Sequence, residues 1–238
     1  MKKHLPNAIT CLNLLCGCLA LTFIFVEGNL VVGAYLVGLA AVADFFDGLV
    51  ARALRVSSPI GKDLDSLADM VSFGVVPGAI LFQLLQETLG PPAALGALAY
   101  LPYAAFLVTV FSALRLAKFN NDTRQTNSFI GLPTPACTLV VASLPLILAA
   151  HPAGSTALNA LVLNSWVLLA LTVLLSGLLV AELPLFALKF KNFGWADNRQ
   201  RFVFLLVALA LVVGLRAAAV PLVVLLYVAM SAVGRRAT

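Results

Sequence analysis

Long apolar runs alternate with short polar turns along almost the whole chain. The runs are too continuous for the apolar stripe of a soluble helix, and about 20 such residues cross the hydrocarbon core of a bilayer. Eight candidate spans follow the runs: 8–26, 30–54, 65–86, 93–117, 133–150, 160–182, 202–216 and 218–234. The pattern therefore predicts an all-α, polytopic membrane bundle of about eight helices.

The polar connections leave no room for a soluble domain. The two longest, 118–131 and 189–201, have the length of loops, and the other connections are rich in the Gly, Pro and Asn of tight turns. We expect one membrane domain over residues 1–238. Its core should occupy about 1–190, and two almost purely aliphatic spans follow in 202–234.

Composition agrees with a membrane protein, since 62% of the residues are hydrophobic and 11% are charged. The net charge of +5 reflects topology rather than a nucleic-acid partner. With a cytoplasmic N-terminus, fourteen of the 15 basic residues fall on one side of the membrane and Arg216 alone on the other. The fourteen are Lys2, Lys3, Arg52, Arg55, Lys62, Arg115, Lys118, Arg124, Lys189, Lys191, Arg199, Arg201, Arg235 and Arg236. This bias predicts a multi-pass protein of the cytoplasmic membrane with both termini in the cytoplasm.

Five of the ten acidic residues lie between positions 44 and 69, inside a stretch that otherwise resembles two membrane helices. Asp44 and Asp47 are three apart, and Asp65 and Asp69 are four apart, so each pair occupies one face of its own helix. The segment 53–62 between them predicts a cytoplasmic turn. The two acidic faces should then meet near the cytoplasmic boundary of the membrane.

Four facing carboxylates cannot all stay ionised near hydrocarbon without compensation. Divalent cations provide it, and all-oxygen ligation favours Mg²⁺ or Mn²⁺. Solvated helix ends, or pairing with Arg52, Arg55 and Lys62, would explain a single such aspartate. Four acids at these spacings favour the metal site, because intramembrane acids are costly. Gly48 leaves a notch beside them, and Arg52 is a candidate phosphate ligand.

The pattern D-x2-D-G-x2-A-R-x8-G-x3-D-x3-D, complete from Asp44 to Asp69, resembles the signature of the CDP-alcohol phosphotransferases. These membrane enzymes transfer a phosphatidyl or related group from a CDP-linked lipid to an alcohol and release CMP. The resemblance implies two divalent cations on Asp44, Asp47, Asp65 and Asp69. It also makes Asp69 the general base that receives the proton of the acceptor hydroxyl.

The same resemblance implies which residues contact the CDP-lipid. Gly48, Arg52 and Ser58 belong to the signature region, and Asn7 and Thr10 belong to an N-terminal segment that approaches the same substrate. For Asn7, capping of a helix N-terminus is the alternative interpretation.

Further segments are similar to one branch of this family, the bacterial-type phosphatidylserine synthases. They are 5–17, 64–78, 113–120 with 129–136, and, more loosely, 179–189. The resemblance implies CDP-diacylglycerol and L-serine as substrates, phosphatidylserine and CMP as products, and a homodimer.

A serine site needs a cation for the carboxylate and an acceptor for the ammonium. Arg115 and Lys118 are candidates for the first and Asp63 for the second, while Asn120 and the turn at 131–135 are candidates to close over the acceptor. The alternatives are snorkelling basic anchors for Arg115 and Lys118 and a helix N-terminal charge for Asp63.

Two other functions stay open. The same chemistry on glycerol 3-phosphate or inositol phosphate would need an additional phosphate-binding basic cluster. A cation transporter would commonly carry paired, interrupted helices in both halves of the chain, whereas the acidic motif occurs once.

Overall fold

The computed structural model describes residues 4–56, 58–90, 96–121, 129–150, 157–185 and 194–234. The first half of the chain contains α1 (His4–Phe25), α2 (Leu30–Leu54), α3 (Pro59–Asp69), the π-helix η1 (Met70–Val75), α4 (Val76–Leu89), the 3-10 helix η3 (Gly96–Phe106) and α5 (Leu107–Asn121). The second half contains β1 (Phe129–Ile130), α6 (Thr134–Ala150), α7 (Ala157–Val162), α8 (Ser165–Val180), β2 (Pro184–Leu185), α9 (Trp195–Leu215), the 3-10 turn η4 (Arg216–Ala218) and α10 (Ala219–Gly234).

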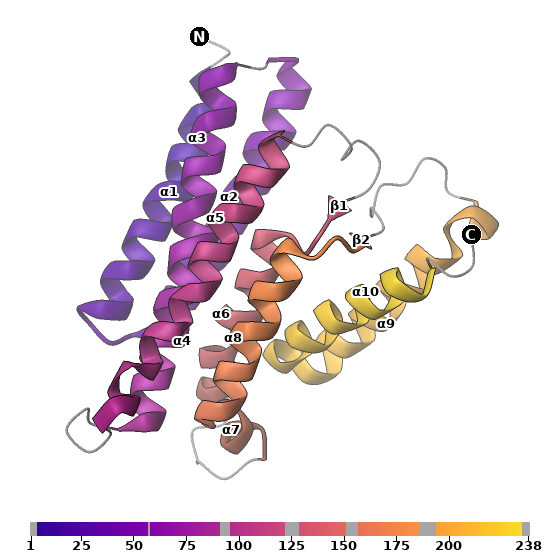
Figure 1. The fold of residues 1–238 in the computed structure, drawn as a ribbon. Helices are drawn as coiled ribbons and strands as arrows, with labels where there is room; N and C mark the ends of the chain where they lie inside the picture. The colour runs from indigo at the N-terminus through magenta and orange to yellow at the C-terminus, as the bar shows by residue number, and fades with distance from the viewer. Residues whose placement is uncertain are drawn as a thin grey trace.

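The helices from α1 to α8 form one bundle with a shared apolar core (Figure 1). Fully or almost fully buried side chains from successive helices meet there, among them Ile24, Val37, Leu81, Val141 and Leu175. The α1–α2 hairpin packs along its length, and η1 and α4 contact α1, α5 and α6. The apolar runs therefore become helices that bury part of each run against the others.

The turn between α2 and α3 is set by local sequence. Arg55 ends α2 in a left-handed conformation, with φ of 53°. Ser58 then caps α3 by accepting a hydrogen bond from the Gly61 amide at 3.0 Å, and Pro59 occupies the first turn, where its missing N–H is harmless. This turn brings the acidic face of α3 back beside that of α2.

A π-helix directly follows the last aspartate of the motif. Pro77 lacks the N–H that an uninterrupted α-helix would direct to the carbonyl of Phe73. The Thr138 hydroxyl lies 2.8 Å from that carbonyl and 2.9 Å from the Thr134 carbonyl, so its proton is shared between two acceptors. The Thr109 hydroxyl donates to the next carbonyl, that of Gly74, at 2.9 Å. Side chains of α5 and α6 thus stabilise the wide turn.

A two-residue antiparallel pair, β1 with β2, is a small addition to the predicted all-α fold. Gly131 follows β1 with φ of 79°, and a Cβ there would lie 2.7 Å from the Leu179 carbonyl oxygen. The Gly131 and Leu132 amides donate to the Leu183 and Leu178 carbonyls, each at 2.9 Å. The turn before α6 is therefore hydrogen-bonded to the C-terminal end of α8 and the residues after it.

The predicted last two spans form a hairpin that is inclined to the bundle (Figure 1). Helices α9 and α10 join at Arg216, whose φ is 50°. The predicted ranges fit this hairpin, except that α9 begins earlier, at Trp195. The predicted span 160–182 is divided instead: α7 ends at Val162, and Asn164 caps the separate helix α8.

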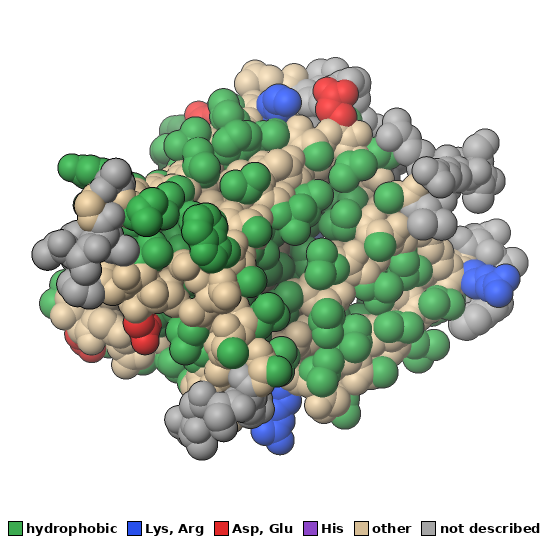
Figure 2. Space-filling view, turned by 60° about the horizontal axis from the view of Figure 1, so that its bottom comes forward, with side chains coloured by type: hydrophobic (Ala, Val, Ile, Leu, Met, Phe, Trp, Pro, Cys, Tyr) green, Lys and Arg blue, Asp and Glu red, His purple; other side chains and the backbone are tan. Residues whose placement is uncertain are grey.

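Exposed apolar side chains cover much of the surface, as Figure 2 shows for one face. Phe45 and Phe46 are examples on α2, and their rings meet edge to face at 5.8 Å. Five described stretches are long and apolar enough to cross a membrane: His4–Phe25, Leu30–Leu54, Pro59–Leu89, Leu98–Asn121 and Asn198–Ala232, the last of which includes the α9–α10 turn. The chain is a multi-pass membrane protein, and the count of eight crossings stays a prediction because α6 and α8 are shorter.

Candidate active site

Three helices meet at the acidic cluster. Helix α2 supplies Asp44 and Asp47 from one face, α3 supplies Asp65 and Asp69 from one face, and α1 packs against both helices. The carboxylates of Asp44, Asp47 and Asp65 offer oxygen atoms that all lie within 4.8 Å of one another. The predicted meeting of the two acidic faces is therefore confirmed for these three residues.

Asp69 lies next to this group, at the end of α3. Its carboxyl group is close enough to that of Asp44 for a hydrogen bond between them. Asp47 is 6% exposed, and the other three aspartates are partly buried. The four acids thus form a continuous group that is largely shielded from solvent.

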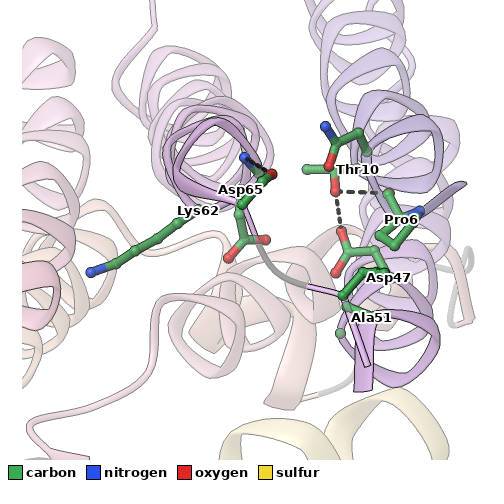
Figure 3. Close-up of a pocket in the computed structure, with 11 residues that line it drawn as sticks. Pro6, Thr10, Asp47, Ala51, Lys62 and Asp65 are labelled. Atoms are coloured by element: carbon green, nitrogen blue, oxygen red, sulfur yellow. Dashed lines mark hydrogen bonds between the residues drawn. The ribbon is translucent and has the colours of Figure 1, made fainter. Parts of the chain in front are cut away.

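Helix α1 contributes polar side chains that hold two of the aspartates. The Thr10 hydroxyl lies 2.6 Å from Asp47 Oδ2 and 3.1 Å from the Pro6 carbonyl (Figure 3). One turn further along, Asn13 Nδ2 donates to Asp69 Oδ1 at 3.2 Å. Asp47 and Asp69 are therefore each oriented by a donor from the same face of α1.

A pocket of about 250 Å³ opens beside the cluster, between α1, α2 and the start of α3. In Figure 3, Asp47 and Asp65 approach from opposite helices and the Lys62 side chain extends away from Asp47. The lining residues are Pro6, Asn7, Thr10, Asp47, Gly48, Ala51, Val56, Ser58, Gly61, Lys62 and Asp65. Two aspartates thus lie at the wall of a cavity that also has polar and small residues.

Four of the five residues predicted to contact the CDP-lipid line this pocket: Asn7, Thr10, Gly48 and Ser58. The fifth, Arg52, is exposed on the last turn of α2, and its guanidinium lies over Gly48, 3.8 Å from where a Cβ would be. Since that distance is an ordinary contact, the space at Gly48 is a notch between the guanidinium and the helix.

The capping interpretation of Asn7 is wrong. Helix α1 already includes His4, so Asn7 lies inside the helix rather than at its N-cap. Its Oδ1 is 3.1 Å from the position of a Cβ on Gly61, so the Asn7 side chain lies close to the first turn of α3. Asn7 instead faces the start of α3 across the pocket.

The predicted serine contacts occupy different environments. Arg115 is 6% exposed, and its Nε donates a hydrogen bond to the Leu132 carbonyl. Its guanidinium lies over the Phe119 ring, 5.7 Å from the ring centroid, and interacts electrostatically with Asp69. Asn120 Nδ2 donates to Ser66 Oγ at 2.8 Å, beside Asp65. Lys118 and Asp63 are exposed. The structure therefore brings Arg115 and Asn120 near the cluster, and leaves Lys118 and Asp63 at the surface.

Asn13 is a site residue that the sequence predictions missed. The sequence pattern could have indicated it, because the polar residues Asn7, Thr10 and Asn13 are spaced three apart in an otherwise apolar helix. Such spacing places them in one stripe on the surface of α1. The contact with Asp69 depends on how α1 packs, which the spacing alone does not give.

The residues present fit a hard divalent cation. Three carboxylates within 4.8 Å supply only oxygen ligands, and their mutual repulsion in a shielded site is relieved by positive charge. The neighbouring pocket leaves room for a ligand with its own oxygen atoms, as Mg²⁺ sites that bind substrate phosphates require.

Comparison with known proteins gives the family. The sequence profile of the CDP-alcohol phosphatidyltransferases matches residues 3–178. The chain is 34% identical over 157 residues to the CDP-diacylglycerol--serine O-phosphatidyltransferase of Bacillus subtilis, a match covering 64% of this chain and 84% of that protein.

Proteins from two other organisms are also similar to the chain. The enzyme of the same name from Helicobacter pylori strain J99 is 33% identical over 138 residues, 57% of this chain and 54% of that protein. The archaetidylserine synthase of Methanothermobacter thermautotrophicus is 31% identical over 150 residues, 60% of this chain and 58% of that protein. The chain thus spans little more than half the length of these two relatives. Profile, relatives and complete acidic motif agree, and the chain belongs to the CDP-alcohol phosphatidyltransferase family.

Proposed function

We propose that the protein transfers the phosphatidyl group of CDP-diacylglycerol to the hydroxyl of L-serine, giving phosphatidylserine and CMP. The observation that carries the proposal is the carboxylate cluster of Asp44, Asp47 and Asp65, with Asp69 beside it. Asp47 and Asp65 of this cluster line a pocket in a membrane bundle. Serine as the acceptor is supported by the names of the relatives.

In this proposal the four aspartates hold two divalent cations, Mg²⁺ or Mn²⁺. When bound, such ions neutralise the diphosphate and stabilise CMP as a leaving group. Asn7, Thr10, Gly48, Ser58 and Arg52 contact the CDP moiety, and the Arg52 guanidinium provides paired donors for phosphate oxygens.

Asp69 acts as the general base. The serine oxygen attacks the phosphorus that carries the diacylglycerol, the bond from that phosphorus to the CMP oxygen breaks, and the serine proton passes to Asp69 as the new bond forms. Asn13 Nδ2, 3.2 Å from Asp69 Oδ1, keeps this carboxylate aimed into the site. Atoms and charge balance, because CMP leaves with the electron pair of the broken bond.

Arg115 is the better of the two candidates for the serine carboxylate. Its Nε is engaged with Leu132, which fixes the guanidinium plane and leaves the Nη groups as donors for a ligand. Arg115 is the only buried Lys or Arg among the residues described. A phosphorylated acceptor such as glycerol 3-phosphate or inositol phosphate would need more buried positive charge, which favours serine.

We also propose that the site faces the cytoplasm from the cytoplasmic membrane. The described N-terminal end of α1, the α2–α3 turn and the end of α5 lie at the same end of the bundle (Figure 1). Arg52, Arg55, Lys62 and Lys118 belong to that end, in accord with the positive-inside rule. A homodimer stays a prediction from the family resemblance.

The proposal is tested with purified protein in mixed micelles, CDP-diacylglycerol and labelled L-serine. We expect phosphatidylserine and CMP in equal amounts with Mn²⁺ or Mg²⁺, loss of both products with EDTA, and recovery when either ion is added back. Glycerol 3-phosphate and inositol phosphate compete in the same assay to decide the acceptor.

Three results would contradict the proposal. Absence of phosphatidylserine with every ion would reject serine transfer, and preferred use of a phosphorylated alcohol would keep the reaction and change the acceptor. Metal flux into proteoliposomes without release of CMP would instead indicate a cation transporter.

A further inference from the structure

Asn13 has one amide atom satisfied and one not. It is 0% exposed, and its Nδ2 donates to Asp69 Oδ1 at 3.2 Å. Its Oδ1 is buried and has no hydrogen-bond partner among the described residues. A buried acceptor without a donor is unusual in a folded protein, since most such atoms are paired.

The orientation of this amide follows from chemistry. As the proposed metal ligand and general base, Asp69 is ionised and only accepts hydrogen bonds, and only the NH₂ end of an asparagine side chain donates them. Turning the amide over would place two acceptor oxygens against each other. Oδ1 is therefore the end directed away from Asp69.

Packing around Asn13 restricts any movement that would bring its Oδ1 to a hydrogen-bond donor. Its backbone carbonyl accepts a hydrogen bond from Ser72 Oγ at 3.0 Å. One turn along α1, a Cβ on Gly17 would lie 2.5 Å from the same Ser72 oxygen, so α1 and the π-helix are in close contact. This packing keeps the side chain of Asn13 beside Asp69, and Oδ1 stays without a donor from the described residues.

We propose that Asn13 determines acceptor specificity: its Oδ1 binds the ammonium group of the amino-alcohol substrate while its Nδ2 positions Asp69. The inference rests on the proposed function. In L-serine the hydroxyl and the ammonium are on adjacent carbons, and in Asn13 the two amide atoms share one carbon. When the serine hydroxyl is hydrogen-bonded to Asp69, the serine ammonium therefore lies near Asn13 Oδ1. The ammonium has donors and no acceptor, so it can donate to this unpaired oxygen.

This assignment replaces Asp63 as the partner of the ammonium. Asp63 is exposed and stands two residues before Asp65, on a different face of α3. A neutral amide oxygen also suits a site that already contains four carboxylates, because a fifth negative charge would add repulsion.

The test replaces Asn13 with leucine, which keeps the approximate shape and removes both polar atoms. Three ligands separate the groups of serine: L-serine itself, ethanolamine without the carboxylate, and 3-hydroxypropionate without the ammonium. The KM for serine and the inhibition constants of the other two are measured with saturating CDP-diacylglycerol and Mn²⁺. Asn159→Leu is the matched control, because Asn159 is also buried but lies on α7, at the opposite end of the bundle (Figure 1).

We expect Asn13→Leu to raise the KM for serine and the inhibition constant of ethanolamine by about 10- to 100-fold, as loss of a hydrogen bond to a charged group implies. The inhibition constant of 3-hydroxypropionate should change less than about twofold, since it has no ammonium to lose. A fall in kcat should accompany these changes, because Asp69 loses its orienting donor. Asn159→Leu should leave all three constants near those of the wild type.

Equal weakening of all three ligands, or no change in any, would overturn the inference and reduce Asn13 to a packing role. A lower affinity for Mn²⁺ with unchanged selectivity would overturn it too, and would assign Oδ1 to the metal site. If Asn13→Leu does not turn over, calorimetric titration of serine and 3-hydroxypropionate into enzyme loaded with CMP and Mn²⁺ gives the same comparison. Failure of the proposed function is distinct: the wild type itself would then make no phosphatidylserine.

Discussion

At the scale of single residues, the site depends on side chains of α1 that carry no charge. Thr10 donates to Asp47, Asn13 donates to Asp69, and Asn7 faces the start of α3. The first two contacts orient the carboxylates of Asp47 and Asp69 without any bound ligand. Such prior orientation of catalytic groups avoids an entropic penalty during the reaction.

The first prediction at this scale concerns Asp69. Asp69→Asn should lower kcat by at least about 100-fold, since general base catalysis contributes that much or more. CDP-diacylglycerol should still bind, because Asp44, Asp47 and Asp65 keep their oxygen atoms in place. Serine turnover and equilibrium binding of CDP-diacylglycerol are the two measurements.

The matched control for this change is Glu87→Gln. It also neutralises a carboxylate of the stretch Pro59–Leu89, but Glu87 is exposed near the far end of that stretch. It should leave turnover within about twofold, as surface substitutions usually have small effects. Near-normal activity of Asp69→Asn would disprove the assignment of the base.

Whether a contact of the site could be predicted depends on how far apart its two residues are in the sequence. The aspartates follow from their spacing within two adjacent helices, which fixes a face of each helix. The bond from Arg115 to Leu132 joins α5 to the residue after the positive-φ Gly131, and the bond from Asn13 to Asp69 spans 56 positions. Contacts of this kind arise from the packing of distant segments, which no local pattern contains.

At the scale of elements, the π-helix after Asp69 is the feature with the most consequence. It adds one residue to a turn, so the helix downstream is rotated by about 100° relative to an uninterrupted α-helix. Asp65 and Asp69 can then face the site while Ile80, Leu81, Leu84 and Leu85 of α4 face the core. The apolar pattern predicts the helix but not this wide turn, because Pro77 is compensated by Thr138, on another helix.

Thr138→Val tests that compensation. The change keeps the shape of a fully buried side chain and removes the hydroxyl 2.8 Å from the Phe73 carbonyl. Removing this donor from a buried carbonyl should lower the free energy of unfolding by about 1–3 kcal/mol. Thermal and denaturant unfolding in detergent, followed by circular dichroism, measure the loss.

Thr22→Val is the control for this substitution. Thr22 also donates to a backbone carbonyl, that of Cys18, but it is exposed and its bond lies within an ordinary helix turn. It should change stability by less than about 0.5 kcal/mol. Equal effects of the two substitutions would show that the hydroxyl of Thr138 has no special role in the π-helix.

At the scale of the whole molecule, the acidic cluster belongs to α2 and α3, which meet at one end of the bundle in Figure 1, and exposed apolar side chains are spread over the face that Figure 2 shows. The apolar runs predict this architecture well, because each run must either cross the membrane or be buried. The angle of the α9–α10 hairpin was not predictable, since its aliphatic sequence has no polar face that would orient it.

The orientation of the molecule gives the prediction at this scale. Single cysteines replace exposed Glu27, in the α1–α2 turn, and exposed Ile60, in the first turn of α3, in a chain without its own cysteines. A membrane-impermeant maleimide should label position 27 in intact cells and position 60 only in inverted vesicles, as the positive-inside rule requires. The reverse pattern would place the site on the other side of the membrane.

Phe45 and Phe46 tie the acidic site to the apolar surface of the bundle. They stand between Asp44 and Asp47 in the sequence, so one turn of α2 presents carboxylates to the interior and aromatic rings to the surroundings of the bundle. Phenylalanine rings have no polar group and favour hydrocarbon over water. The acidic cluster and the lipid-facing surface therefore share one turn of α2, so any rotation of this helix would move both together.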